Sequence, residues 1–159
     1  MGRMYTVQFN GVAITALQDL FEVLTATDSV ALIHGFSLFQ TSDVGDAAEE
    51  ILRLETVRGI GTVTSGSGGS TPTAQPVDDG DAAFGGTVEA NNTTRLAVGT
   101  GSLETLEQFG WNVRIPVVHF YTPELRPLIK PGERWTLSLP AAPADSITTS
   151  GMLWLEEIG

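Results

Sequence analysis

The sequence contains no cysteine, and Lys130 is the only lysine among its 8 basic residues. Without cysteine the chain has no disulfides, no thiolate-ligated zinc and no thiol nucleophile. The 19 acidic residues give a formal net charge of −11, which would repel the phosphate backbone of a nucleic acid, so direct nucleic-acid binding is not expected. Its apolar runs are shorter than the roughly 18 residues of a membrane-spanning helix. We therefore expect no membrane association either.

What the sequence does contain is a series of short segments in which apolar and polar residues alternate. In the segment 131–159, Trp135, Leu137 and Leu139 alternate with polar residues, a period typical of a strand with one buried face. Turn signals recur at roughly 8–12 residues, which is typical of a β-sandwich or barrel. Since 159 residues fit one domain, we predict a single all-β domain over residues 1–159, a two-sheet β-sandwich of the jelly-roll type.

Near the N-terminus, two local patterns predict a turn and an orientation. The dipeptide Asn10-Gly11 between alternating segments predicts a two-residue hairpin. In the segment 20–25, alternation places Phe21 and Val23 toward the core and Glu22 outward.

In the rest of the chain, three segments give less regular patterns. Residues 41–49 form a polar connection with at most one helical turn. Residues 102–108, SLETLEQ, predict a short helix that begins after Ser102 as its N-cap. Residues 109–121 predict a strand that Pro116 interrupts, and because proline cannot donate to a ladder, this strand should lie at a sheet edge or carry a bulge.

Residues 59–87 differ from the rest of the chain in being rich in glycine, serine and proline. A connection of this length inside one domain is uncommon and usually has a function. We call it the excursion. We predict that it is extended and that the apolar residues spaced along it dock either on this domain or on a neighbouring subunit; these residues are Val63, Pro72, Pro76, Val77 and Phe84.

The aromatic residues supply the candidates for interaction. Trp135 and Trp154 fit the core pattern, whereas Trp111 lies on the predicted edge strand and should be partly exposed. Tyr121 could join Trp111 in a platform that stacks on sugars, and Arg114 on the same strand could form an ion pair across an interface. The predicted interaction residues are Phe84, Trp111, Arg114 and Tyr121.

The sequence offers little for chemistry. His34 and His119 could meet Glu22 or Glu55 in a metal site, and the alternative is that each histidine is packed with one hydrogen bond. The nucleophile elbow and the phosphate-binding loop are absent. We therefore assign no catalytic, cofactor-binding or metal-binding residue and expect that the protein is not an enzyme.

Three segments together resemble a family. They are SGSGGSTPTAQP (65–76), FGGTVEANNTT (84–94) and PGERWTLSLPAAPADSITTSGMLWLEEIG (131–159). The chain resembles small jelly-roll-like structural proteins of tailed bacteriophages and prophages. The resemblance implies a decoration, or cement, protein that binds the major capsid protein on the outer surface of the virion head as a homotrimer. It implies no individual site residues.

Two functional hypotheses follow. The first is this non-enzymatic capsid decoration protein. The second is a carbohydrate- or receptor-binding module of a phage tail or head fibre, which would use Trp111 and Tyr121 for stacking.

Overall fold

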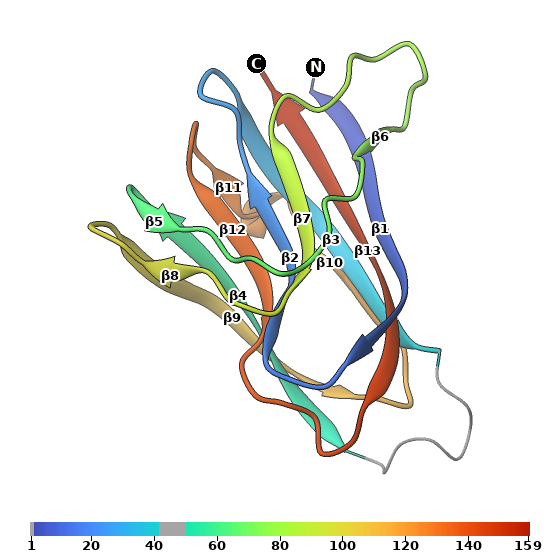
Figure 1. Cartoon of the computed structure of the whole chain (residues 1–159). Coiled ribbons are helices and arrows are strands. Elements are labelled where there is room, and N and C mark those ends of the chain that lie inside the picture. Colours follow the sequence, from blue (N-terminus) through green and yellow to red (C-terminus); the bar gives the residue numbers. More distant parts are fainter. Residues whose placement is uncertain (1, 42–49) are drawn as a thin grey trace.

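The computed structural model describes residues 2–41 and 50–159 (Figure 1). The described residues are almost entirely β-strand, and none of their helices is long and apolar enough to cross a membrane. The elements are β1 (Arg3–Ile14), β2 (Gln18–Leu24), β3 (Val30–Gln40), β4 (Ile51–Ile60), β5 (Val63–Thr64), β6 (Gln75–Pro76), β7 (Thr87–Asn92), β8 (Ala97–Val98), β9 (Ser102–Asn112), β10 (Val117–Phe120), the 3-10 turn η1 (Pro123–Leu125), β11 (Leu128–Ile129), β12 (Arg134–Leu139) and β13 (Ile147–Ile158).

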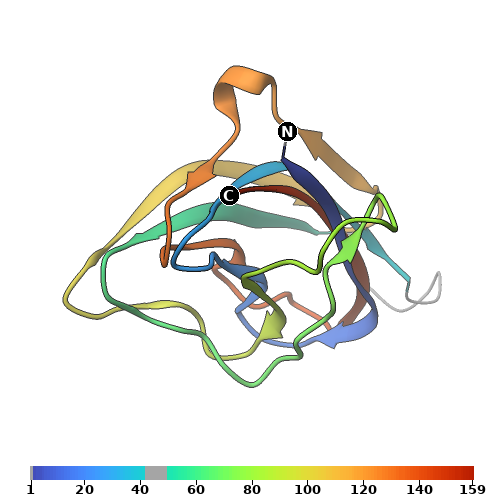
Figure 2. The ribbon, with the colours of Figure 1, turned by 90° about the horizontal axis from the view of Figure 1, so that it is seen from above.

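The strands form two antiparallel sheets that face each other, as the view from above shows (Figure 2). Sheet A has the order β10-β3-β13-β1-β6, with β11 also pairing with β3, and sheet B has the order β7-β2-β12-β4-β9. Apart from the short strands and β7, the chain passes from one sheet to the other at every step except that from β4 to β9, which pair within sheet B. The result is the arrangement of a jelly roll, with β1-β13-β3-β10 on one side and β2-β12-β4-β9 on the other. The predicted β-sandwich of jelly-roll type is confirmed.

The core lies between the sheets and follows the alternation in the sequence. Trp135, Leu137 and Leu139 of β12 are fully buried, and so are Leu153 and Leu155 of β13. Each large apolar side chain buried in this way contributes about 1.5–3 kcal/mol. The two C-terminal strands do not pair with each other, because β12 is central in sheet B and β13 is central in sheet A. Their proline-containing connection is thus a crossover between layers.

The predicted hairpin at Asn10-Gly11 is wrong. Strand β1 continues through it, and the register against β13 shifts between Phe9 and Val12, which marks a β-bulge. Gly11 takes a positive φ of 63°, which glycine adopts without the steric cost of a side chain. The same dipeptide suits a tight turn and a bulge, and here pairing with β13 on both sides of Gly11 selects the bulge.

The predicted helix at residues 102–108 is also wrong, since these residues belong to β9, which pairs with β4 from Ser102 to Asn112. So short a helix is marginal alone, and the ladder satisfies the backbone instead. The segment 109–121 is divided between two strands, β9 in sheet B and β10 in sheet A, with Pro116 in the exposed connection. Both are edge strands, as predicted. Most of the connection 41–49 lies outside the described residues.

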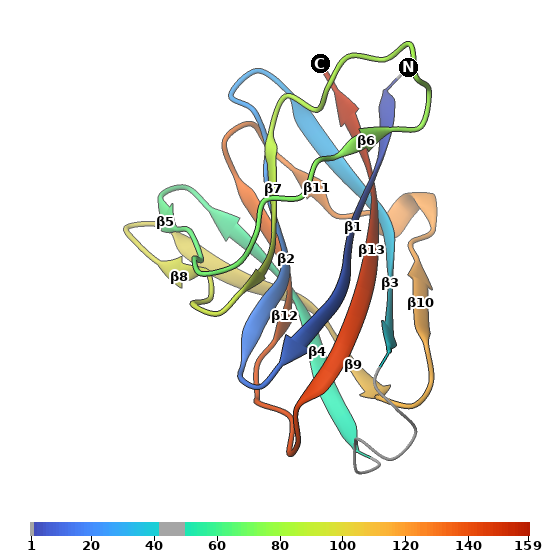
Figure 3. The same cartoon turned by 45° about the vertical axis from the view of Figure 1, so that its right-hand side comes forward.

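The excursion lies against this domain and connects both sheets. Strand β5 pairs with β8, Ser70 bridges to Ala90 beside β7, and β6 pairs with β1 at the edge of sheet A. Figure 3 shows the excursion passing beside β7 toward β1. The apolar residues of the excursion were predicted to dock on this domain or on a neighbouring subunit. Phe84 docks on this domain, because its ring packs on Tyr5 with ring centroids 5.4 Å apart.

Candidate binding surfaces

The outer face of sheet B carries a buried carboxylate that the excursion covers. Glu22 does point away from the core, as the alternation predicts, but its side chain is fully buried. It accepts hydrogen bonds from Arg134 at 2.6 Å, the Ser65 hydroxyl at 2.9 Å, the Gly66 amide at 2.9 Å and Asn92 at 3.2 Å. A buried carboxylate needs such donors to offset its lost hydration. The glycine- and serine-rich sequence of the excursion is therefore what makes the burial of Glu22 possible.

A second carboxylate of β2, Asp19, is buried under the segment that follows β7. Asp19 accepts hydrogen bonds from the Leu96 amide at 2.6 Å and from the Ser138 hydroxyl, and Arg95 bridges Asp19 at 3.3 Å and Glu55 at 2.7 Å. Burial raises the pKa of the Asp19 carboxyl in spite of these donors. Two of these donor residues, Arg95 and Leu96, lie in the segment that follows β7, so the network fixes that segment on sheet B.

The other end of the excursion is fixed in the same way. Glu157 at the end of β13 accepts hydrogen bonds from the Gly85 amide at 3.0 Å, the Ser29 hydroxyl at 3.1 Å and Arg3 at 2.8 Å. Glu156, its neighbour, points to the opposite face, because adjacent residues of a strand alternate.

The two histidines do not meet Glu22 or Glu55. His34 lies 2.9 Å from Glu156 on the outside of sheet A. The His119 ring packs against Phe109 and Tyr121, with centroids 4.8 and 4.6 Å away. The metal site considered for these histidines is not formed, and no cluster of three metal-ligating side chains occurs among residues 2–41 and 50–159.

Two of the four predicted interaction residues are buried. Trp111 is only 1% exposed, and its indole N–H donates to the Ile115 carbonyl at 3.0 Å. Tyr121 is 6% exposed, and burial together with the nearby Glu107 carboxylate raises the pKa of its hydroxyl. The prediction of an exposed Trp111–Tyr121 platform is wrong, because the chain turns from sheet B to sheet A here and folds both rings inward.

The other two predicted residues lie apart from each other. Phe84 is half-buried against Tyr5. Arg114 is exposed in the connection between β9 and β10, where its backbone amide donates to the Asn112 side chain at 3.1 Å. The four residues do not form one surface.

An aromatic pair, in which one ring is exposed and the other is half-buried, lies instead on the outer face of sheet A. Phe120 is 62% exposed, and its ring stacks on Trp154 with centroids 4.8 Å apart and planes 28° apart. The two residues flank Gly35 in one row across the sheet. A side chain at Gly35 would collide with the His119 carbonyl at 2.3 Å and the Phe120 ring at 2.8 Å, so glycine allows the rings to meet. The assignment of Trp154 to the core is therefore wrong.

The same face is nearly free of charge. The outward residues in the centre of β13 are Met152, Trp154 and Glu156. Of these three, only Glu156 carries a carboxylate, and that carboxylate is paired with His34. The other outward side chains on the strands of this face are apolar or neutral, and they include Met4, Thr6, Gln8, Leu32, Ser37, Phe39, Val118, Phe120, Met152 and Trp154. For a chain of net charge −11 this is an unusual surface. Exposed apolar patches of this kind mark sites of protein interaction.

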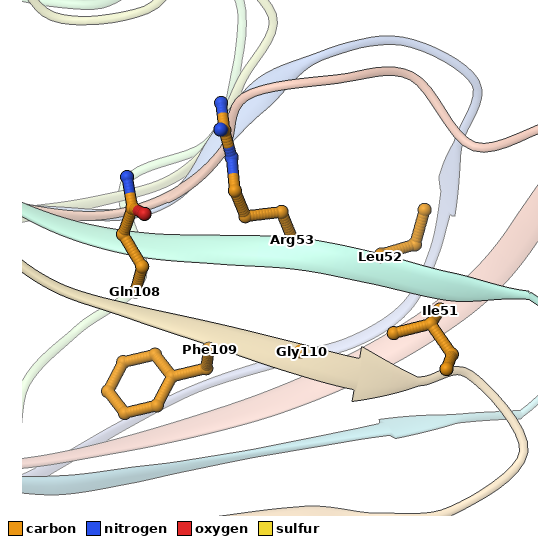
Figure 4. A pocket seen from close by; sticks show the side chains of 6 residues that line it. All are labelled: Ile51, Leu52, Arg53, Gln108, Phe109 and Gly110. Atoms are coloured by element: carbon orange, nitrogen blue, oxygen red, sulfur yellow. The ribbon is translucent and has the colours of Figure 1, made fainter.

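A shallow cavity of about 350 Å³ lies at the end of β4 and β9. Figure 4 shows Arg53 and Gln108 extending from one side of this strand pair and Phe109 from the other. Its lining is mainly apolar, with one cation and one amide and no acid–base pair. It could accept an apolar group but offers no arrangement for bond chemistry.

Comparisons with known proteins leave the chain without an assigned family. No family model matches it, and no curated protein matches it. A search of solved structures finds a chain from the structure of infectious bursal disease virus Gx strain, at 15% identity and a TM-score of 0.22. The match covers 99% of this chain and 41% of that chain. A TM-score of this size does not establish a common fold.

Proposed function

We propose that this protein is a non-enzymatic structural component of a bacteriophage particle, which decorates the outer surface of the head and stabilises contacts of the major capsid protein. The observation that carries the proposal is the outer face of sheet A, where the exposed Phe120 stacks on the half-buried Trp154 in a surface almost free of charge. The resemblance of the segments 65–76, 84–94 and 131–159 to phage decoration proteins supplies the identity of the partner.

The physical logic of such a role rests on surface burial. A protein that binds only the assembled shell stabilises that shell by mass action and needs no reactive group. The Phe120–Trp154 pair can supply the aromatic centre that interfaces commonly use. On the opposite face, the excursion is held over the buried Glu22 by hydrogen bonds from the Ser65 hydroxyl and the Gly66 amide, so sheet A presents the surface that is free for a partner.

The test is a co-sedimentation measurement with purified heads that lack decoration. We expect the wild-type protein to bind expanded heads at micromolar concentration and the Trp154→Ser variant to bind at least about tenfold more weakly. The matched control is Val98→Ser, because Val98 on β8 is 58% exposed but lies on the opposite side of the molecule from sheet A. Failure of the wild-type protein to bind heads would reject the proposal, and equal binding by Trp154→Ser would reject the role of this face.

A further inference from the structure

The two sheets have four edges, and three of them are protected against pairing with another chain. At one edge of sheet A, β6 is two residues long and contains Pro76, which lacks an N–H. The part of β1 beyond β6 carries the bulge against β13. Strand β7 is covered by Ser70, whose amide and carbonyl bond to Ala90 at 2.9 and 2.8 Å. Strand β9 carries Glu104 and Glu107 and has a register irregularity against β4. Short edges, proline, charge and bulges are the usual devices that prevent edge-to-edge association.

Strand β10 is four residues long and has no proline, no formal charge and no bulge against β3. Its sequence, Val117–Phe120, contains no acidic residue, lysine or arginine, and Val118 and Phe120 are 59% and 62% exposed. Within the described part of the chain, β10 pairs only with β3 and forms the end of sheet A (Figure 3). The open edge is therefore both apolar and unprotected.

The ladder geometry identifies the backbone groups that face outward. The Tyr121 amide donates to the His34 carbonyl of β3 at 2.9 Å. In an antiparallel pair alternate residues bond to the same neighbour, so His119 and Val117 also face β3 in this register. The N–H and C=O groups of Val118 and Phe120 consequently point to the open edge.

We infer that β10 pairs with β10 of a second copy of this chain, antiparallel and across a two-fold axis. In the register that uses all the outward groups, Val118 of one copy lies opposite Phe120 of the other, and His119 lies on the axis. Each copy then donates two N–H groups and accepts at two carbonyls. The outer faces of the two A sheets join, and their Phe120–Trp154 pairs lie on one continuous surface.

Symmetry and charge favour a second copy as the occupant. A closed trimer made through β10 would need a different surface to receive it, and the other three edges are protected. Two chains of net charge −11 repel each other, and an edge strand without acidic residues is where they can approach with least repulsion. Added salt screens this repulsion, so pairing should strengthen with ionic strength. A contact between this acidic chain and a basic partner would instead weaken as the ionic strength increases.

Sedimentation velocity on the full chain, over a concentration series at low and high salt, tests the inference without any head protein. We expect a wild-type dimer, with a larger dimer fraction at high salt. Val118→Lys should raise the dissociation constant at least about tenfold by placing a charge on the edge. Val118→Pro should act in the same direction, because it removes an N–H that faces outward and leaves the bonds to β3 intact.

The matched control is Val98→Lys, since Val98 is 58% exposed and lies on β8, away from β10. It should leave the dimer unchanged, and circular dichroism verifies that each variant is folded. A wild-type monomer at every concentration, a trimer, or a Val118→Lys dimer as stable as the wild type would overturn the inference. Because heads are not used, this outcome is independent of the decoration proposal: a monomer that still binds heads would refute only the pairing.

Discussion

The outer faces of the two sheets are opposites. Sheet B has charged residues on its outer face, yet Asp19 and Glu22 are almost completely buried there. Sheet A has apolar residues on its outer face, yet Phe120 and Val118 are more than half exposed. Charged side chains are usually exposed and apolar side chains are usually buried. The outer faces of this sandwich show the reverse. The difference shows that the excursion, rather than the composition of each strand, decides which face of the sandwich is available to a partner.

Each face has a physical reason for its state. Glu22 of sheet B binds the excursion through donors on Ser65 and Gly66, whereas Asp19 and Glu55 bind Arg95 in the segment after β7. The buried charges in turn depend on these two covering segments. The apolar face of sheet A has no covering segment among the described residues. Contiguous apolar surface left in water is the usual mark of an interaction site, so the contrast points to sheet A as the binding face.

The largest expected effect is on the covered face. Glu22→Ala would leave Arg134 and the Gly66 amide without their shared acceptor. Removing one partner of a buried ion pair costs about 3–5 kcal/mol, so we expect the free energy of unfolding to fall by this amount in urea denaturation. The control is Glu104→Ala, because Glu104 forms an exposed ion pair with Arg58, which contributes at most about 1 kcal/mol. Equal losses in the two variants would show that Glu22 does not hold the cover.

The next largest expected effect is a loss of stability when a side chain is added at Gly69, where the excursion lies directly against β7. A methyl group at Gly69 would lie 2.1 Å from the Ala90 carbonyl oxygen, and backbone cannot easily yield. Gly69→Ala should therefore cost about 1–3 kcal/mol and increase proteolytic cleavage within residues 65–74. Gly80→Ala is the control, because its nearest contact is the flexible Asp78 side chain at 3.3 Å. Unchanged cleavage in Gly69→Ala would indicate that the excursion is not held against β7.

A smaller effect is expected on the open face. Phe120→Ala removes the stack on Trp154, which contributes about 0.5–1.5 kcal/mol. Thermal unfolding should show only this modest loss, whereas binding to heads should fall strongly. Leu125→Ala, at a residue 67% exposed on η1, should change neither. A large loss of stability in Phe120→Ala would mean that the ring serves packing rather than binding.

The smallest effect is a dependence of stability on pH through Asp19. Burial raises its folded pKa above the ordinary value of 3.8, so the folded state binds the proton more tightly than the unfolded state. The stabilisation that protonated Asp19 gives to the folded state is complete below pH 3.8, and it is lost as the pH rises through the raised pKa of the folded state. Asp19→Asn removes this term, so the wild-type protein should lose stability relative to the variant as pH rises through this range. If the unfolding free energy of the wild type instead rose relative to that of Asp19→Asn as pH increased, the assignment would be contradicted.

Much of the fold could be predicted because alternation fixes which side of a strand each residue takes. Trp135, Leu137 and Leu139 were correctly assigned to the core in this way. Trp154 was assigned incorrectly, although Leu153 and Leu155 on either side of it are the inward residues. Strict alternation with Leu153 and Leu155 would have placed Trp154 on the outer face, where it is half-buried.

Other features had no local signal. Asn10-Gly11 suits a hairpin or a bulge equally, and the choice depends on β13, far along the chain. The segment 102–108 has weak preferences of its own, and the ladder with β4 decides its conformation. Trp111 lies on an edge strand, as predicted, but the turn from β9 to β10 buries it. Edge position and exposure are separate properties.

The sequence alone determined that strands would form, which side chains each would direct toward the core, and that they could make a two-layered sandwich, because those properties depend on neighbours one or two residues apart. Only the tertiary structure decided which outer face would be closed. The donors that cover Glu22 lie on Ser65, Gly66, Asn92 and Arg134, and no pattern within β2 specifies that these distant segments meet there.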